Sequence, residues 1–432
     1  MRLGLDRLLL DDRLLSRLRG RRVALVANPA SMTSVELGFE HALDALVSRL
    51  GASITAAFGP QHGMRGDRQY NMDESPTYLD PRHGIPVFSL YGEVRRPTEE
   101  MLEHFDVVLV DLQDAGWRGY TWVATLLYML EACARTGKEL WVLDRPNPAG
   151  RCVEGKKLVP GEESFVGVVP VPQRHGLTLG EMARYMVAHA SLDLAFHVVE
   201  MEGYRPEEPP GFGWPQDRVW INPSPAISSL NGVRCFTGTV LLEGTHLSEG
   251  RGTTTPLEVF GAPDLPVDAL LAHMRRVAPE FCTGCYLRPC FFEPFFDKYA
   301  KTLCAGVQIH ADFPGYSPQV FRPYRLISAL LKAMRVVLPE RELWRDFYYE
   351  YETGRRPIDV ILGGPSLRKW VDDPAASAAD WDSGQPNDEI AELRYVALDQ
   401  LPEPMTLAAR TRVLDALQGT TGVVRVIRGA IS

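Results

Sequence analysis

The sequence lacks an apolar run long enough to cross a membrane, and it lacks an excess of basic residues. Its 432 residues carry a formal net charge of −9, so it has no positively charged footprint for nucleic acid. The first 22 residues alternate leucine with aspartate and arginine, unlike the uncharged apolar core of a secretory signal. We therefore expect a cytoplasmic protein that binds neither membranes nor nucleic acid.

Three common motifs of enzyme active sites are also missing. No G-x-G-x-x-G follows the first expected strand, and no G-x-x-x-x-G-K-[ST] occurs in the chain, so nothing marks a dinucleotide or nucleoside triphosphate site. The absence of G-x-S-x-G removes the common serine hydrolase interpretation. We expect no cofactor.

Cysteine is scarce and odd in number, with seven residues, as is usual in a reducing compartment. Four of them could in principle bind zinc: Cys282, Cys285, Cys290 and Cys304. Their spacing is not that of a zinc ribbon, and aromatic residues fill the gaps. Buried free thiols are the favoured interpretation and no metal site is expected, with zinc binding as the alternative.

Apolar runs alternate with helical patterns in the first half of the chain. Strands are expected at residues 22–27, 54–58, 85–90, 106–112 and 139–143, and helices at 39–50, 97–104 and 120–136. Continuous apolar strands separated by helices predict a parallel sheet covered on both faces, that is, a Rossmann-like α/β domain.

The chain is long for one core, and we expect two domains, residues 1–230 and a smaller α/β domain at 231–432. The second domain is expected to contain a strand at 305–311, a helix at 324–337, an α+β region at 344–370 and a polar surface excursion at 372–385.

Polar side chains gather where the expected strands end. Because the carboxyl ends of parallel strands share one edge of the sheet, these residues should converge on one cleft. They are Asn28, Gln61, His62, Glu93, Asp111, Asp114, Asp144 and Arg145. The alternative for Asp114 and Asp144 is that they cap helices or brace turns, and Thr178 with Glu181 has the spacing of a capping box.

Two further features suit a sugar ligand. Aromatic residues that include Tyr91 and Tyr120 lie near the expected cleft and offer faces on which sugars stack. A glycine-rich stretch at 242–255 carries Glu243, Glu249, Arg251 and Thr253, as expected where backbone approaches a ligand. The alternative for that stretch is a mobile surface loop.

These residues fall within motifs that carry a family resemblance. The motifs are FGPQHGMRG (58–66), SLYG (89–92), VDLQDAGWRGYTW (110–122), VLDRPNP (142–148), VEG (153–155), RHGLTLGE (174–181), PSP (223–225), LEGTHLSEGRGTTTPLE (242–258) and GVQIHADF (306–313). Their order and spacing resemble those of the NamZ-type exo-β-N-acetylmuramidases, and IDVILGGPSLRKW (358–370) extends the match weakly.

The resemblance implies release of N-acetylmuramic acid from the non-reducing end of peptidoglycan fragments. The expected partner is therefore a muramic-acid-containing glycan or muropeptide. Such hydrolysis needs a carboxylic acid to protonate the leaving oxygen and a group that stabilises an oxocarbenium-like centre. Arginines suited to hold the lactyl carboxylate are Arg65, Arg118, Arg145 and Arg251.

One position departs from the family pattern. The family usually reads F-G-P-E-H-G, and its glutamate is the proposed acid, whereas this chain has Gln61. An amide cannot donate a proton at the needed acidity. Candidates for the missing acid are Glu93, Asp111, Asp114 and Glu249. Ala226 and His246, each where asparagine is usual, also suggest an altered pocket.

Three hypotheses remain from the sequence. The first is an active muramidase with a different acid. The second is a sugar-binding relative that has lost catalysis, or a glycosidase for a different amino sugar. The third, a Rossmann-type oxidoreductase, depends on the fold alone and lacks the nucleotide fingerprint. The number of carboxylates expected in the cleft favours the first hypothesis. Buried carboxylates cost stability, and a protein that only binds a sugar would have little need for so many of them.

Overall fold

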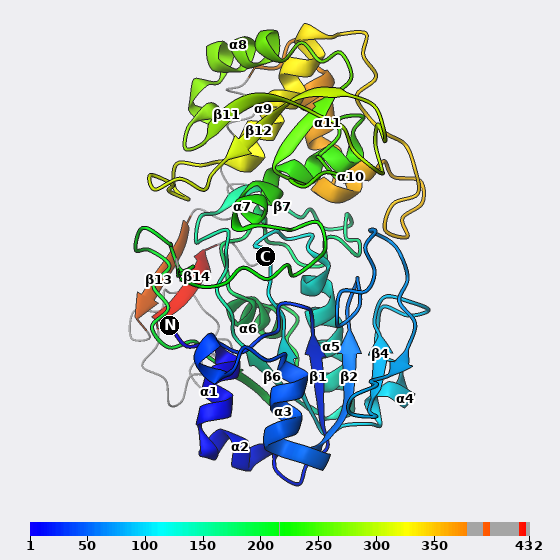
Figure 1. Cartoon of the computed structure of the whole chain (residues 1–432), viewed down its shortest axis with the longest axis vertical. Coiled ribbons are helices and arrows are strands. Elements are labelled where there is room, and N and C mark those ends of the chain that lie inside the picture. Colours follow the sequence, from blue (N-terminus) through cyan, green and yellow to red (C-terminus); the bar gives the residue numbers. More distant parts are fainter. Residues whose placement is uncertain (216, 378–391, 398–422, 429–432) are drawn as a thin grey trace.

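The computed structural model describes residues 1–215, 217–377, 392–397 and 423–428. A seven-stranded sheet with helices on both faces forms the lower part of the molecule (Figure 1). Only the pairing of β3 with β4 is antiparallel, and the other pairings are parallel. The strands lie in the order β3 (Tyr78–Leu79), β4 (Pro86–Ser89), β2 (Ile54–Gly59), β1 (Val23–Ala27), β5 (Val107–Asp111), β6 (Glu139–Leu143) and β9 (Phe196–Val199).

This order confirms the Rossmann-like α/β class, and each of the five predicted strands is found with both ends within one residue. The chain builds outward from β1 to β2 and β4, then returns to β5 and builds the other way through β6 and β9. The strand order therefore reverses between β1 and β5. In such sheets ligands bind in the crevice beyond the carboxyl ends of the strands near this reversal.

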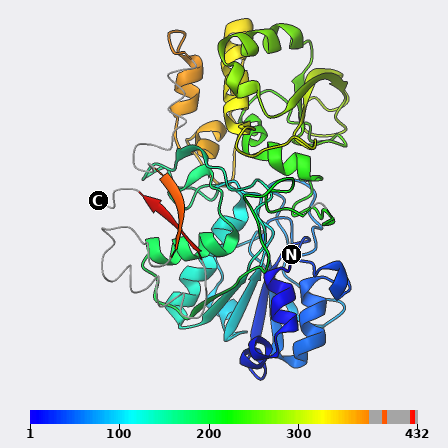
Figure 2. The ribbon, with the colours of Figure 1, turned by 90° about the vertical axis from the view of Figure 1, so that its left-hand side faces the viewer.

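Helices cover both faces of the sheet, as the side view in Figure 2 shows, and alternate strand residues pack into two separate apolar clusters. On β1, Val23, Leu25 and Ala27 pack with α1 (Gly4–Leu10), α2 (Asp12–Leu18) and α3 (Ala42–Leu50). Ala24 and Val26 face the other layer, which contains α5 (Thr121–Thr136) and α6 (Leu179–His189). The short helix α4 (Glu99–Leu102) precedes β5. Burial on both faces explains why these strands are apolar throughout.

The predicted capping box of α6 is confirmed. Thr178 Oγ1 accepts a hydrogen bond from the Glu181 amide at 3.3 Å, and the Glu181 carboxylate accepts one from the Thr178 amide at 2.8 Å. Glu181 therefore serves the helix start.

The C-terminal part lies above the sheet (Figure 1) and holds a three-stranded antiparallel sheet. Its elements are α7 (Leu230–Thr239), β10 (Val259–Ala262), α8 (Val267–Val277), β11 (Tyr286–Phe292), β12 (Cys304–His310), α9 (Pro323–Val337), α10 (Pro357–Leu362) and α11 (Ser366–Asp372). The remaining short pieces are the antiparallel pair β7 (Glu154–Lys157) and β8 (Pro172–Arg174), the antiparallel pair β13 (Glu392–Ala397) and β14 (Val423–Arg428), and the 3-10 turns Val35–Leu37, Gly51–Ser53, Val240–Gly244 and Pro279–Cys282.

The expected strand at 305–311 and helix at 324–337 are present as β12 and α9. The expectation of an α+β region at 344–370 is wrong in its strand content. That segment contains α10, most of α11 and isolated bridges. Its buried aromatic residues pack into the apolar core from irregular backbone and not from a strand. The expected polar excursion at 372–385 lies largely outside the described residues. No helix of the described chain is both long and apolar enough to cross a membrane.

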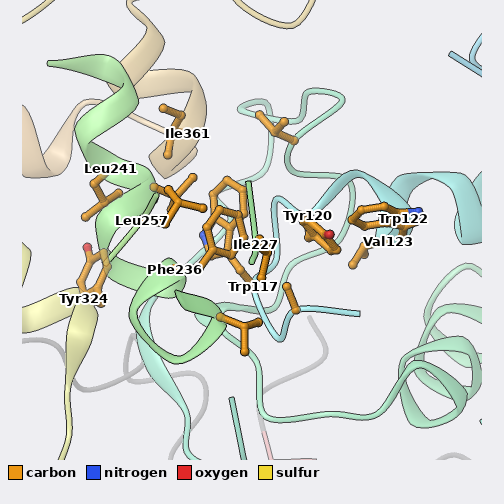
Figure 3. Packing of buried hydrophobic residues seen from close by; sticks show 14 of the residues in the cluster. Trp117, Tyr120, Trp122, Val123, Ile227, Phe236, Leu241, Leu257, Tyr324 and Ile361 are labelled. Carbon is orange, nitrogen blue, oxygen red and sulfur yellow. The ribbon is translucent and has the colours of Figure 1, made fainter. Parts of the chain in front are cut away.

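One apolar core runs from the sheet into the C-terminal part. Trp117 and Tyr120, which follow β5, pack edge to face against Phe236 of α7, with ring centroids 5.4 and 5.7 Å apart. Leu257 and Ile361 extend the same cluster (Figure 3). The division at residue 230 stays a prediction, and the apolar contact between the two parts is continuous.

Arg118 ties the two parts together through backbone carbonyls. Its guanidinium is fully buried and donates to Lys156 O at 2.9 Å, Val171 O at 3.0 Å and Leu362 O at 2.6 Å. Burial lowers the pKa of Arg118 to about 10, so the side chain stays charged at neutral pH. Such charge-assisted hydrogen bonds fix the end of α10 over the loops of the sheet domain.

A buried ion pair joins the ends of β5 and β6. Arg145 donates to Asp111 through Nε at 2.6 Å and Nη2 at 2.8 Å, and neither side chain is more than 1% exposed. Burial raises the pKa of Asp111, and Arg145 opposes that rise. The bidentate geometry compensates both charges only as long as both partners are present.

We predict that Arg145→Met lowers the free energy of unfolding by about 3–5 kcal/mol, because it leaves the Asp111 carboxylate buried and unpaired. Adding Asp111→Leu should recover much of that loss, since no uncompensated charge then remains. Urea unfolding measures both. The matched control is Arg184→Met, which removes a partly exposed ion pair with Glu200 and should cost at most about 1 kcal/mol. Equal losses in the two single variants would contradict the prediction.

Candidate functional site

The loop after β2 carries the first part of the site. The chain turns sharply at His62 and Gly63, whose φ angles are +70° and +81°. This turn directs Gln61 and His62 into a cavity between the sheet edge and the C-terminal part. His62 Nδ1 lies 2.8 Å from Arg68 O, and burial lowers the pKa of His62 to about 4. His62 is therefore neutral near pH 7 and holds the loop in shape.

A carboxyl group from the C-terminal part meets this loop. Gln61 Nε2 donates to Glu350 Oε1 at 3.1 Å, and Tyr91 Oη donates to Glu350 Oε2 at 2.9 Å. Glu350 is 4% exposed. Residues that follow β2 and β4 thus hold a carboxyl group that lies 289 positions beyond Gln61 in the sequence.

The surroundings of Glu350 favour its protonated form. Burial and the nearby charge of Glu243 raise the pKa of Glu350 to about 7, while the hydrogen bonds from Tyr91 and Gln61 oppose the rise. Burial also raises the pKa of Tyr91, so its hydroxyl keeps its proton. A carboxylic acid that is half protonated near neutral pH is suited to general acid catalysis.

A chain of alternating charges lies beside Glu350. Glu243 accepts a hydrogen bond from Tyr349 Oη at 2.8 Å and forms an ion pair with Arg251 Nη2. Arg251 Nε lies 3.2 Å from Glu249, whose other oxygen accepts from Lys298 Nζ at 2.7 Å. Burial alone would raise the pKa of Glu249, but Lys298 and Arg251 outweigh it and lower that pKa. Glu249 is therefore ionised and unsuited to donate a proton.

The cavity that contains this cluster is small and aromatic. Its volume is about 50 Å³, enough for water but not for a sugar ring. Its polar wall includes Gln61, His62, Asn71, Glu243, Arg251 and Glu350. Trp117, Tyr120, Phe236 and Tyr349 supply the aromatic wall. A hexosamine therefore requires side chains here to move apart.

A second, more open cavity of about 390 Å³ lies on the other side of Glu350. It is lined by Arg95, Arg96, Tyr128, Phe165 and Tyr351 together with Glu350 and its neighbours. The Arg95 guanidinium lies over the rings of both Tyr91 and Tyr351, 4.3 and 3.9 Å from their centroids. This stacking fixes the segment around Glu350 against the end of β4.

The structure brings together only part of the set that the sequence predicts. Two predicted residues, Tyr91 and Glu249, reach the cluster through Glu350 and Arg251. Five more predicted residues line the small cavity: Gln61, His62, Tyr120, Glu243 and Arg251.

Several predicted residues are buried, do not line the small cavity and are bonded within the fold. Asn28 donates to Gln113 O, and Asp114 accepts from the Gly116 amide at 2.7 Å and contacts His175. Asp144 accepts from Thr178 Oγ1 at 2.9 Å and from the Gly180 amide at 2.8 Å, so it sits at the start of α6. These bonds match the capping alternative for Asp114 and Asp144.

The other predicted residues also lie away from the cavity. Asp111 is paired with Arg145, and Arg118 is bound to backbone carbonyls. Glu93 is exposed, and Arg65 pairs with Asp44 and Asp80. Thr253 donates to Gly250 O at 2.6 Å and shapes its own loop. Of the four arginines proposed to hold a lactyl carboxylate, only Arg251 lines the cavity.

Sequence reasoning missed Glu350, Tyr349, Thr121, Asn71 and Lys298. The one available signal for Glu350 was the unusual run Phe347-Tyr348-Tyr349-Glu350-Tyr351-Glu352, in which a carboxylate sits among aromatic residues. Glu350 and Tyr351 both have positive φ angles, +46° and +67°, a conformation that non-glycine residues rarely adopt. Such backbone strain often accompanies a functional site.

In the part of the chain that the structure describes, no group of three or more His, Cys, Asp or Glu side chains could hold a metal ion. Cys282, Cys285, Cys290 and Cys304 are free thiols. Burial raises the pKa of Cys285 to about 12 and that of Cys304 to about 11, so these two thiols are protonated near pH 7.

Known proteins with similar structures share this fold. A crystal structure of a DUF1343 family protein from Bacteroides fragilis superposes with a TM-score of 0.71 at 27% identity, covering 89% of this chain and 96% of that one. A second DUF1343 family structure from the same organism gives a TM-score of 0.62 at 26% identity, with coverages of 88% and 93%.

Sequence comparison gives the family. Residues 23–231 match the family model described as exo-beta-N-acetylmuramidase NamZ, N-terminal, and residues 234–388 match its C-terminal counterpart. The chain is also 38% identical over 309 residues to the peptidoglycan beta-N-acetylmuramidase NamZ of Bacillus subtilis, which covers 71% of this chain and 72% of that protein. These matches cover most of the chain, and they show that this chain belongs to the NamZ family of glycosidases.

Proposed function

We propose that this chain is an exo-β-N-acetylmuramidase that releases N-acetylmuramic acid from the non-reducing end of peptidoglycan-derived fragments. The observation that supports the proposal most directly is the pair of buried carboxyl groups, Glu350 and Glu243, in one aromatic-lined cavity. Glycoside hydrolysis uses two carboxyl groups in different roles, one as acid and one that stabilises or captures the oxocarbenium-like centre.

The environment of each carboxyl group suits a different role. The pKa of Glu350 is raised to about 7, so this group can carry a proton at neutral pH. Glu243 forms an ion pair with Arg251 and accepts a hydrogen bond from Tyr349 Oη at 2.8 Å. Glycosidases give their two carboxyl groups different environments, so that one acts as the acid and the other as the carboxylate.

Arg251 supports recognition of the acidic sugar. N-acetylmuramic acid differs from N-acetylglucosamine by its lactyl group, which carries a carboxylate. The Arg251 contacts to Glu243 and Glu249 engage Nη2 and Nε. A guanidinium binds carboxylates through a planar fork, and Arg251 is the one arginine in the wall of the small cavity.

The competing hypothesis is a relative that binds a glycan without cleaving it. Gln61 favours it, because no acid stands at that position. The raised pKa of the adjacent Glu350 favours the enzyme. The cytoplasmic location expected from the sequence stays a prediction, which cell fractionation would test.

We predict that the purified protein releases 4-nitrophenol from 4-nitrophenyl β-N-acetylmuraminide. Its kcat/KM on that substrate should exceed its kcat/KM on the matching β-N-acetylglucosaminide by about 10-fold to 100-fold, the worth of one charge-assisted contact to the lactyl group. Release from neither substrate would refute the muramidase. Equal release from both would indicate a glycosidase for a different amino sugar.

We also predict that Arg251→Lys lowers kcat/KM on the muraminide by about 10-fold to 100-fold. Lysine keeps the positive charge between Glu243 and Glu249, so the cluster stays neutralised, but it loses the planar fork. The ratio of the two kcat/KM values should therefore fall toward one. Arg184→Lys, which alters a surface pair with Glu200, is the control. An unchanged ratio in Arg251→Lys would remove Arg251 from lactyl recognition.

A further inference from the structure

The partners of Gln61 fix its amide in one orientation. Thr121 Oγ1, at the start of α5, donates to Gln61 Oε1 at 2.8 Å. Gln61 Nε2 therefore faces Glu350, whose Oε1 lies 3.1 Å away. The amide hydrogen is a donor that cannot be lost near neutral pH, so position 61 permanently holds the Glu350 carboxyl in place.

Glu350 also stands where a glycosidic bond would have to lie. It is the residue that the small cavity shares with the open cavity of about 390 Å³. The aromatic rings of Trp117 and Tyr120 lie on one side, and those of Tyr128 and Phe165 on the other. Once the side chains of the small cavity have moved apart to admit a hexosamine, a disaccharide with one ring in each cavity would place its linking oxygen beside the Glu350 carboxyl.

We propose that Glu350 is the catalytic proton donor of this chain and that Gln61 is its positioning residue. This inference rests on the muramidase proposed above. Glu350 gives its proton to the glycosidic oxygen as the bond from that oxygen to C1 breaks, and the bonding electrons stay with the oxygen. The second sugar leaves as an alcohol. Water then supplies a hydroxyl to C1, and its remaining proton returns to the Glu350 carboxylate.

Glutamine at position 61 suits this arrangement. A glutamate there would put a second carboxyl group about 3 Å from Glu350, and two such groups cannot both ionise freely. With Gln61, that second carboxyl group is absent from position 61. Burial and Glu243 raise the pKa of Glu350 to about 7, and protonated Glu350 is the active form. Activity should therefore fall as the pH rises through about 7.

The test compares leaving groups in Glu350→Gln. On the disaccharide of N-acetylmuramic acid β-linked to N-acetylglucosamine, which needs an acid, kcat/KM should fall about 10²-fold to 10⁴-fold. On the 2,4-dinitrophenyl β-muraminide, whose leaving group needs no proton, the fall should stay below about tenfold. Glu342→Gln, an exposed change in the same segment, is the matched control and should leave both rates unchanged.

The outcomes separate the two proposals. If the unaltered protein hydrolyses neither substrate, the muramidase proposal fails. If it hydrolyses both and Glu350→Gln lowers both rates equally, or neither, the muramidase stands and Glu350 is not the proton donor.

A second variant keeps Glu350 in place and covers the case in which Glu350→Gln does not fold. Tyr91→Phe removes the hydroxyl that lowers the pKa of Glu350. The high-pH limb of kcat/KM on the disaccharide should then move to higher pH, while the dinitrophenyl substrate shows no such limb. A limb that stays in place in Tyr91→Phe would overturn the assignment, because a purely structural Glu350 would not set the pH profile.

Discussion

The cost of burying charge is the constraint on which this structure depends. Each carboxyl group near the sheet edge must meet a cation or a set of hydrogen-bond donors, because an uncompensated charge costs several kcal/mol. Asp111 has Arg145, Glu243 and Glu249 share Arg251, and Lys298 completes that chain. Within the described part of the chain, the side chains that donate hydrogen bonds to the Glu350 carboxyl group, those of Gln61 and Tyr91, are both neutral. The cost of burying the Glu350 charge is therefore avoided by protonation, whereas the neighbouring carboxyl groups form ion pairs.

The same constraint explains why sequence analysis predicted the fold better than the site. Strands such as β1 are apolar on both faces, so their positions could be predicted to within one residue. Acidic residues at strand ends could not be sorted in this way. A carboxylate after a strand can bind substrate, cap the next helix or form an ion pair, and the local sequence is the same in each case. Asp144 accepts hydrogen bonds at the start of α6 and Asp111 pairs with Arg145, and both sets of partners are determined by the tertiary fold.

Glu350 could not be predicted because its role depends on contacts across the two parts of the chain. Its hydrogen-bond partners follow β2 and β4, whereas Glu350 belongs to an irregular segment before α10. No periodic pattern marks such a segment. Two of the arginines that connect the parts act differently. Arg118 binds backbone carbonyls, and Arg95 lies over the rings of Tyr91 and Tyr351, so both contacts require the finished fold.

The separation of 289 positions between Gln61 and Glu350 has a consequence for synthesis of the chain. During translation the sheet domain emerges from the ribosome and can fold first. At that stage the loop after β2 is present, but the buried carboxyl group that it holds has not been made. With Glu350 as the proposed proton donor, the site is incomplete until roughly four-fifths of the chain has been translated. A nascent or truncated chain that ends before residue 350 lacks that carboxyl group.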